Sequence, residues 1–380
     1  MTKDSRNIVL QKMIAEIQAN KKELLAQNAI DVQEYKGNDK SMYDRLIIND
    51  KKIDSMIASL QQVIEHEDPT MKTLSSFKHE NGLIIENKTV PFGTILIIYE
   101  SRPDVTVEAS AIALKSGNKI LLKGGKEARR SNLVLHQCWL NALNQTNVEA
   151  QTVRYLDFSR EQMQKYLENP DTKIDLMIPR GGEKLIAYVK SIAKCPVLVS
   201  GRGNNFLYVS QHADLEVAQD IIIQSKISKI SACNSLDKVL VSKEMEDDFL
   251  IKIQEALSKE GVEIVENPAK DTWYEEFLAK KIVLSKIDGL EKAINLINQY
   301  SGGHSATIVT TNIEEAQYFM EHVDCAAVYH NASTRFTDGG QFGLGAEMAI
   351  STEKLHHRGP LGLEQLVTNK WFVYGNGQVR

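Results

Sequence analysis

The chain has 380 residues and a mass of 42.7 kDa, with 42% hydrophobic and 25% charged residues. This composition is typical of a globular protein and disfavours disorder, collagen and coiled coil. A length of about 150 residues per domain predicts two to three domains. The net charge of −5 and the pI of about 6.0 argue against nucleic acid as the main partner, because binding a phosphate backbone needs a concentrated basic surface.

No segment has the length of a membrane span, since the apolar run 94–99 is far shorter than the roughly 20 residues that a bilayer requires. Residues 1–7 are polar and no apolar signal-peptide core follows them, so we expect a cytoplasmic protein. No Cys-x-x-Cys pair and no His-Glu-x-x-His motif occurs, which predicts free thiols and no metal site. The four cysteines are Cys138, Cys195, Cys233 and Cys325.

Helices are predicted first along the chain. Apolar residues recur at helical spacing between Ile8 and Leu25 and again near 53–64. From Asn81 the pattern changes, and 83–86 with 88–90 predict a short hairpin ended by a Pro-Phe-Gly turn.

Strands and helices then alternate as far as residue 225. The predicted strands are 94–99, 119–123, 152–156, 175–178, 196–199 and 206–209, and the helices between them are 105–115, 127–143, 161–167, 183–193 and 215–225. This alternation predicts a parallel sheet with helices on both faces. Ligands are expected at the carboxyl ends of the strands of such a sheet.

A second α/β block begins near Ser231. Its predicted strands are 238–241, 262–265, 282–285, 306–310 and 326–329, and its helices are 245–258, 291–300 and 314–322. A Gly-rich tail from Asn331 leads to a strand-like segment at 371–374, and we expect this late single strand to pair with a remote segment or with another subunit. The sequence therefore predicts two successive doubly wound α/β domains and a soft boundary between them.

Two loops share an apolar strand, a basic residue, two glycines and a following helix. They are LLKGGKE at 121–127 and MIPRGGEK at 177–184. Glycines allow close approach of the backbone, and a helix N-terminus offers free N–H groups, so either loop suits the phosphates of a nucleotide. Plain tight βα turns are the alternative, because neither loop has the spacing of a dinucleotide-binding or P-loop motif.

Cys233 is the candidate nucleophile among the thiols. Its neighbours in Ser-Ala-Cys-Asn-Ser at 231–235 are small and polar and lie between a predicted helix and a predicted strand, which suits an exposed, reactive thiol. A buried structural cysteine is the alternative. Arg335, in the Gly-rich cluster 331–347, has the chemistry to bind a carboxylate or phosphate with two hydrogen bonds, unless that cluster is only a structured surface loop.

Four longer stretches are specific enough to indicate a family. They are VPFGTILIIYESRPDVTVEASAIALKSGNKILLKGGKEARRSN at 90–132, DLMIPRGG at 175–182, NASTRFTDGGQFGLGAE at 331–347 and STEKLHHRGPLGLE at 351–364. With these stretches the chain resembles the gamma-glutamyl phosphate reductases, or glutamate-5-semialdehyde dehydrogenases, of the aldehyde dehydrogenase superfamily.

The resemblance implies a domain plan and a reaction. It implies an NADP-binding domain at 1–230 with a hairpin arm near 82–91, a catalytic domain at 231–345, and a return segment with a C-terminal oligomerisation strand at 346–380. The implied reaction is the NADPH-dependent reduction of L-glutamyl 5-phosphate to L-glutamate 5-semialdehyde with release of phosphate, the second step of proline biosynthesis. A homo-oligomer and, as a possible partner, glutamate 5-kinase are implied as well.

The resemblance also assigns roles to residues. Cys233 matches the nucleophile that forms a thioester with the substrate, and its backbone N–H is a natural donor to the oxyanion. The matching cofactor contacts are Lys123, Gly181, Gly182 and Glu276, the substrate candidates are Arg102, Arg335 and Thr337, and the second catalytic position is Asp104.

Several positions depart from the family pattern. Asp104 stands where the family more often has Asn, and an ionised Asp cannot donate a hydrogen bond to an oxyanion. The stretches 201–206 (GRGNNF) and 235–238 (SLDK) are atypical, and 267–281 is shortened. Residues 199–203 lack the base glutamate of hydrolytic relatives, which suits exchange with phosphate rather than hydrolysis.

Two alternatives follow. A catalytically weakened homologue would bind nucleotide or act as a scaffold for a kinase partner. A CoA-acylating aldehyde dehydrogenase would use the same thioester, although the C-terminal motif argues against it.

Overall fold

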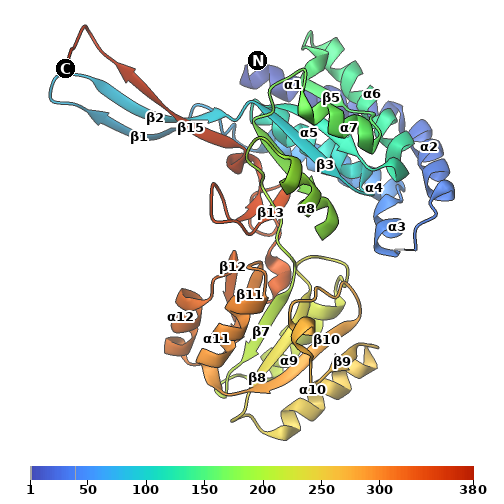
Figure 1. Cartoon of the computed structure of the whole chain (residues 1–380), viewed down its shortest axis with the longest axis vertical. Coiled ribbons are helices and arrows are strands. Elements are labelled where there is room, and N and C mark those ends of the chain that lie inside the picture. The colour runs from blue at the N-terminus through green and yellow to red at the C-terminus, as the bar shows by residue number, and fades with distance from the viewer. Residues whose placement is uncertain (1, 39) are drawn as a thin grey trace. The chain divides into compact units, whose positions relative to one another are not determined.

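The computed structural model describes residues 2–38 and 40–380, and the chain divides into two units, each built on one parallel sheet (Figure 1). Unit 1 contains residues 1–199, 343–349 and 361–380, and unit 2 contains residues 200–342 and 350–360. The boundary expected after residue 230 lies instead after residue 199. The reason is that β7 (Asn205–Val209) pairs with strands of the second sheet, so the segment that carries it folds with unit 2.

The sheet of unit 1 has the strand order β5-β4-β3-β6. These strands are β3 (Thr94–Tyr99), β4 (Lys119–Gly124), β5 (Val153–Tyr155) and β6 (Leu176–Arg180), all parallel. β3 is buried along its whole length, as its unbroken apolar sequence requires of a central strand.

Helices cover both faces of this sheet. The helices of unit 1 are α1 (Lys3–Ala19), α2 (Lys21–Glu34), α3 (Lys40–Leu46), α4 (Asp50–Glu65), α5 (Pro103–Lys115), α6 (Arg129–Gln145), α7 (Arg160–Glu168) and α8 (Glu183–Ile192). Side chains of α1, α4, α5 and α6 share one apolar core with the first face, and those of α7 and α8 share a second core with the opposite face. The predicted two-sided α/β architecture is confirmed here.

Unit 2 has a six-stranded parallel sheet in the order β12-β11-β7-β8-β10-β9. Besides β7, the strands are β8 (Leu236–Ser242), β9 (Glu263–Val265), β10 (Lys281–Ile287), β11 (Ser305–Val309) and β12 (Ala327–His330). α9 (Leu215–Ile227) and α10 (Asp247–Lys259) pack on one face, and α11 (Gly289–Tyr300) and α12 (Ile313–His322) pack on the other. This unit is doubly wound, as predicted.

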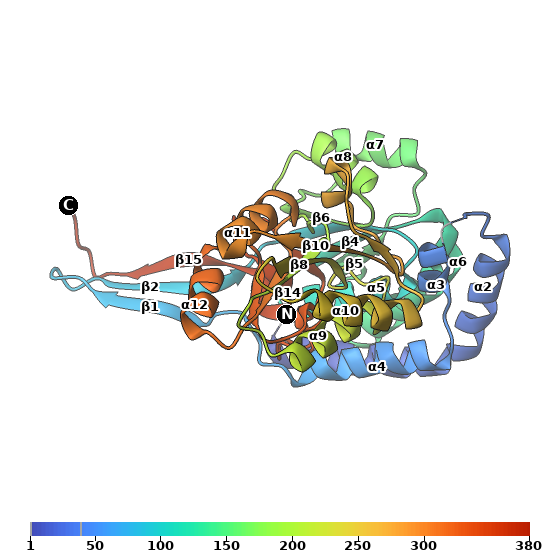
Figure 2. The same cartoon turned by 90° about the horizontal axis from the view of Figure 1, so that it is seen from below.

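A three-stranded antiparallel arm extends from unit 1 (Figures 1 and 2). Its strands are β1 (Thr73–Lys78), β2 (Ile84–Pro91) and β15 (Val367–Tyr374). The hairpin is formed by β1 and β2, so the expectation of two short strands inside 83–90 is wrong: those residues make the single strand β2. The late strand does pair with a remote segment, because β15 lies along β2 with Tyr374 opposite Ile84. A small pair, β13 (Ala349–Ser351) and β14 (Gly359–Leu361), completes the strands.

Candidate active site

Cys233 lies in the connection between α9 and β8 and is exposed, whereas Cys138 and Cys325 are buried and Cys195 is intermediate. Burial raises the pKa of the Cys138 thiol to about 12 and that of Cys325 to about 11, so neither is suited to nucleophilic attack. The prediction that Cys233 differs from the other thiols in exposure is confirmed. Its loop precedes β8, so the thiol lies at the amino end of that strand.

Residues just before and at the start of β7 pack against the backbone of Cys233. A Cβ atom on Gly203 would lie 2.0 Å from the carbonyl oxygen of Cys233, so only glycine fits at this position. The buried amide of Asn205 lies 2.8 Å from the same carbonyl oxygen and 2.7 Å from that of Ser235. The atypical stretch 201–206 therefore supports the loop of the nucleophile.

The side chain of Asn234, the residue after Cys233, holds the segment of Arg335 next to this loop. Asn234 donates from Nδ2 to the carbonyl oxygens of Arg335 (3.1 Å) and Thr337 (2.9 Å), and Thr334 returns a hydrogen bond to the carbonyl of Asn234. Burial lowers the pKa of the Arg335 guanidinium, while the neighbouring Cys233 acts in the opposite direction. The thiol and the guanidinium are thus electrostatic neighbours.

Thr337 has a different environment from the one predicted. Its side chain is fully buried, and its hydroxyl lies 2.7 Å from the hydroxyls of both Ser305 and Tyr329. A buried hydroxyl with two protein partners is poorly placed to contact a substrate. Thr337 instead fixes the turn that carries Arg335.

Unit 1 brings its predicted residues to the carboxyl ends of three adjacent strands. Lys123 lies at the end of β4, Arg102 follows β3, and Gly181 follows β6, with β3 between the other two strands. The expectation of a ligand site at this edge therefore fits unit 1.

A cavity of about 270 Å³ opens beside Lys123. Its lining is cationic and aromatic and consists of Lys123, Gly124, Gly125, Lys126, Arg129, Tyr155, Asp157, Phe158 and Ser159. Burial lowers the pKa of Lys123, whose Nζ donates to the Gly124 carbonyl oxygen at 2.7 Å. A Cβ on Gly124 would lie 2.3 Å from Asn132, so the close approach predicted for this glycine loop is present.

The second glycine loop precedes α8. The N–H of Gly182 donates to Glu100 at 3.0 Å, and a Cβ on Gly181 would lie 2.2 Å from the same carboxylate. The carboxylate of Glu100 therefore already accepts a hydrogen bond from one of the backbone amides that the sequence suggested for binding a phosphate.

Asp104 is buried at the N-terminus of α5 between two cations. Its Oδ2 lies 2.8 Å from Lys52 Nζ and 3.5 Å from Arg102 Nη2. Burial tends to raise the pKa of Asp104, but Arg102, Lys52 and Arg180 outweigh it, and the pKa is lowered. The carboxylate is ionised and accepts hydrogen bonds only, so Asp104 does not have the chemistry of an oxyanion donor.

Glu108 belongs to the same cluster and was missed in the sequence. Burial, reinforced by the Asp104 carboxylate, raises the pKa of Glu108 to about 7. The signal was present in the spacing, since positions 104 and 108 are one helical turn apart on α5. Lys52, Arg102, Glu108 and Arg180, all of intermediate exposure, thus form a charged cluster around the buried Asp104.

Glu276 lies in unit 2, in the segment between a short 3-10 turn (Lys270–Trp273) and β10. Its carboxylate is among the groups that act to raise the pKa of Lys238 on β8. Among the described residues, no group of His, Cys, Asp and Glu side chains is arranged to hold a metal ion. Within the same residues, none of the helices has both the length and the apolarity needed to cross a membrane.

Comparison with known proteins places this architecture in a family. The model of the aldehyde dehydrogenase family matches residues 1–273 and 262–349. A propionaldehyde dehydrogenase of Rhodopseudomonas palustris has the same fold, with a TM-score of 0.71 at 15% identity over 98% of this chain and 92% of its own. The chain therefore belongs to the aldehyde dehydrogenase family.

Within that family, gamma-glutamyl phosphate reductases match nearly the whole chain at about 40% identity. The protein of that name from Dictyoglomus thermophilum is 40% identical over 391 residues, which cover 99% of this chain and 94% of the relative. The crystal structure of the gamma-glutamyl phosphate reductase of Thermotoga maritima matches with a TM-score of 0.95 at 40% identity, covering 100% of this chain and 95% of that one.

Proposed function

We propose that this protein reduces L-glutamyl 5-phosphate to L-glutamate 5-semialdehyde and phosphate with NADPH, the second step of proline biosynthesis. The observation that carries the proposal is the exposed thiol of Cys233 next to Arg335, in a chain that is 40% identical over its full length to reductases of this name. The proposed setting is the cytoplasm, where thiols stay reduced.

The chemistry starts at the sulfur of Cys233. A cation next to a thiol favours the thiolate, which attacks the acyl carbon of the substrate. The C–O bond to phosphate breaks, phosphate leaves with the bonding electron pair, and a thioester remains on Cys233. The backbone N–H of Cys233 stabilises the oxyanion of each tetrahedral intermediate. After reduction, the thiohemiacetal collapses, releasing the aldehyde and restoring the thiol.

The cofactor supplies the hydride when it is bound, and residues of this chain fit its polar groups. The cations of the 270 Å³ cavity, Lys123, Lys126 and Arg129, suit a phosphate, and Tyr155 and Phe158 offer faces for an aromatic base. Gly181 and Gly182 are proposed for the pyrophosphate and Glu276 for the nicotinamide ribose. Arg102 and Arg335 are proposed to bind the anionic groups of the substrate.

The arm is proposed to join subunits into a homo-oligomer. Its strands expose several large apolar side chains, which favours burial against another copy of the chain. The exposed residues are Leu74, Phe77, Ile84, Trp371, Val373 and Tyr374.

The reverse assay tests the proposed function. Glutamate 5-semialdehyde and NADP⁺ are expected to yield NADPH only when phosphate is present, and Cys233→Ser is expected to abolish this rate. Cys195→Ser, in a thiol of intermediate exposure, is the control and should retain it. Turnover that needs CoA instead of phosphate would identify the CoA-acylating alternative. No turnover with either, from a folded protein that binds NADPH, would identify the weakened homologue.

A further inference from the structure

Two neighbouring side chains at the start of β8 hold the segment that carries Glu276. The Oδ2 of Asp237 accepts a hydrogen bond from the backbone N–H of Phe277 at 3.0 Å. The Nζ of Lys238 donates to the carbonyl oxygen of Glu275 at 2.8 Å. The two bonds fix the backbone on both sides of Glu276.

Asp237 and Lys238, which we call the clamp, are both buried and charged. Asp237 and Lys238 are 1% and 0% exposed, and Asp237 is held in turn by Lys226 of α9, whose Nζ lies 2.8 Å from Oδ1. Lys238 Nζ also lies 3.9 Å from the centre of the Phe277 ring, a short cation–π distance. Both the main chain and a side chain of the segment are therefore held by Lys238.

Two residues of the atypical stretch 201–206 form hydrogen bonds with the backbone just before Glu275. Arg202 donates to the Tyr274 carbonyl oxygen at 3.1 Å, and Asn204 donates to that of Trp273 at 2.7 Å. Directly after the segment, Leu278 has φ +46°, a left-handed conformation that non-glycine residues adopt only where their surroundings impose it. The backbone around Glu276 is thus fixed at four atoms and strained at its exit.

Buried charges are a costly way to pack a loop, because apolar side chains of similar volume would serve stability as well or better. Their advantage is directional, since a lysine and a carboxylate specify where a carbonyl and an N–H must lie. We infer that Lys238, together with Asp237, is a positioning residue that orients Glu276 toward the cofactor from the strand that follows the Cys233 loop. This inference rests on the proposed function, in which Glu276 binds the nicotinamide ribose.

The first test is Lys238→Met, which keeps an apolar stem over Phe277 and removes the donor. We expect the dissociation constant of NADPH, measured by its fluorescence, to rise about tenfold, as for loss of one charge-assisted hydrogen bond. The KM values for semialdehyde and phosphate should not change. Lys281→Met is the matched control, because Lys281 also lies over Phe277, at 5.3 Å, but pairs with Glu263.

A double-mutant cycle separates positioning from general support. If Lys238 acts through Glu276, Lys238→Met should have no further effect on NADPH binding in a Glu276→Gln protein. Additive effects, or NADPH binding by Lys238→Met equal to that of the wild type, would overturn the inference. Asp237→Asn is the second variant and should weaken NADPH binding in the same direction, because Asn keeps the acceptor for Phe277 but loses the ion pair with Lys226.

The pH profile gives a readout that loose packing would not change. Burial lowers the pKa of Lys238 to about 8; Asp237, Glu275 and Glu276 act to raise it and Lys226 to lower it, and Lys281 Nζ lies 5.3 Å from the centre of the Phe277 ring. NADPH affinity of the wild type should fall as the pH rises through about 8, relative to that of Lys238→Met. Equal pH profiles for the two proteins would contradict the clamp.

The outcomes distinguish this inference from the proposed function. If the wild type lacks phosphate-dependent NADP⁺ reduction but Lys238→Met still weakens NADPH binding through Glu276, the function fails and the clamp stands. If turnover is present and the two proteins bind NADPH equally, the clamp fails and the function stands.

Discussion

At the scale of single residues, the Arg335 guanidinium and the Cys233 thiol interact electrostatically. A guanidinium next to a thiol favours the thiolate and stabilises developing negative charge. We expect Arg335→Gln to lower kcat roughly a hundredfold and to slow alkylation of Cys233 by iodoacetamide at pH 7. Alkylation at the wild-type rate would show that the two groups do not interact in solution, and Arg335→Lys should recover part of both rates.

Glu108 makes the stability of the protein depend on pH. Burial, then the Asp104 carboxylate, raises its pKa from 4.5 in the unfolded chain to about 7, so the folded state binds the proton more tightly. The unfolding free energy of the wild type should therefore fall, relative to that of Glu108→Gln, as the pH rises from about 4.5 through 7. We expect Glu108→Gln to be more stable at pH 8 by on the order of 1–3 kcal/mol, and denaturant titrations at pH 5 and pH 8 measure the difference.

The residues that the sequence revealed are those with a local signal. Small polar neighbours indicated that Cys233 is exposed, and the glycine pair at 124–125 indicated a close approach of the backbone. Lys238 and Asn205 gave no such signal, because their roles depend on partners 37 and 28 positions away along the chain. Thr337 lies in a polar, Gly-rich stretch, yet the hydroxyls that bury it come from β11 and β12.

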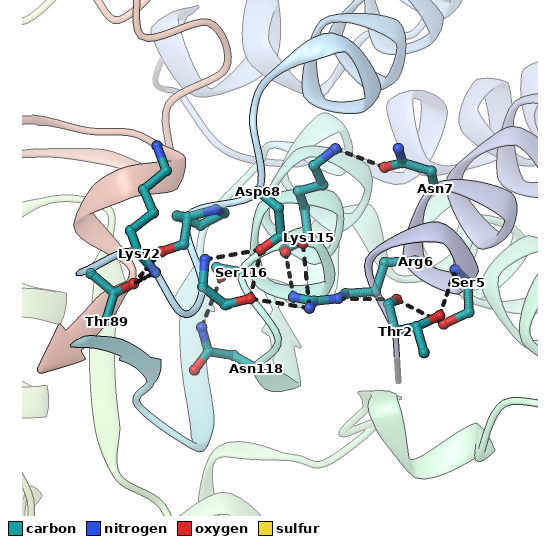
Figure 3. Close-up of polar contacts among 12 residues, drawn as sticks. Thr2, Ser5, Arg6, Asn7, Asp68, Lys72, Thr89, Lys115, Ser116 and Asn118 are labelled. Atoms are coloured by element: carbon teal, nitrogen blue, oxygen red, sulfur yellow. Dashed lines mark hydrogen bonds and ion pairs between the residues drawn. The ribbon is translucent and has the colours of Figure 1, made fainter. Parts of the chain in front are cut away.

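At the scale of elements, Arg6 connects α1 to α5 and to the segment that enters the arm (Figure 3). Its guanidinium donates to the Lys115 carbonyl oxygen at 2.7 Å and lies 3.3 Å from the Asp68 carboxylate, with Arg6 and Asp68 both buried. Lys72, nearby, forms exposed ion pairs with Glu67 and Glu364.

These two cations differ in their expected contribution to stability. Arg6→Met leaves the buried Asp68 carboxylate without its cation and should reduce the unfolding free energy by about 3–5 kcal/mol. Lys72→Met breaks only surface pairs and should cost at most about 1 kcal/mol. Denaturant unfolding of both variants compares them, and equal losses would contradict this assignment.

The prediction of helices and strands succeeded where the apolar pattern was strong. It failed where pairing with another strand determines whether a strand forms or which sheet it joins. The buried strands β3, β4, β8 and β11 and the helices between them follow from periodicity. β1 was missed because all six of its residues are exposed and its partner β2 supplies the pairing. β7 was predicted as a strand but assigned to the wrong unit, since sequence order does not reveal which sheet a strand joins.

At the scale of the whole molecule, the arm presents an apolar surface that a second copy of the chain would cover. Trp371 is 57% exposed on β15, opposite Asn87 of β2. Trp371→Glu should shift the protein to a smaller species in size-exclusion chromatography with light scattering. Ile313→Glu, at an apolar residue 67% exposed on α12, is the control and should leave the assembly intact.

The division of the chain into units has a consequence for its synthesis on the ribosome. Unit 2 is inserted into unit 1, and β15 meets β2 across nearly 280 intervening positions. Domains fold as units as they emerge during translation. All of unit 2, including the Cys233 loop, is therefore synthesised before the arm can acquire its third strand. If subunits join through this arm, as proposed, the complete three-stranded surface for that contact is available only after translation has passed β15.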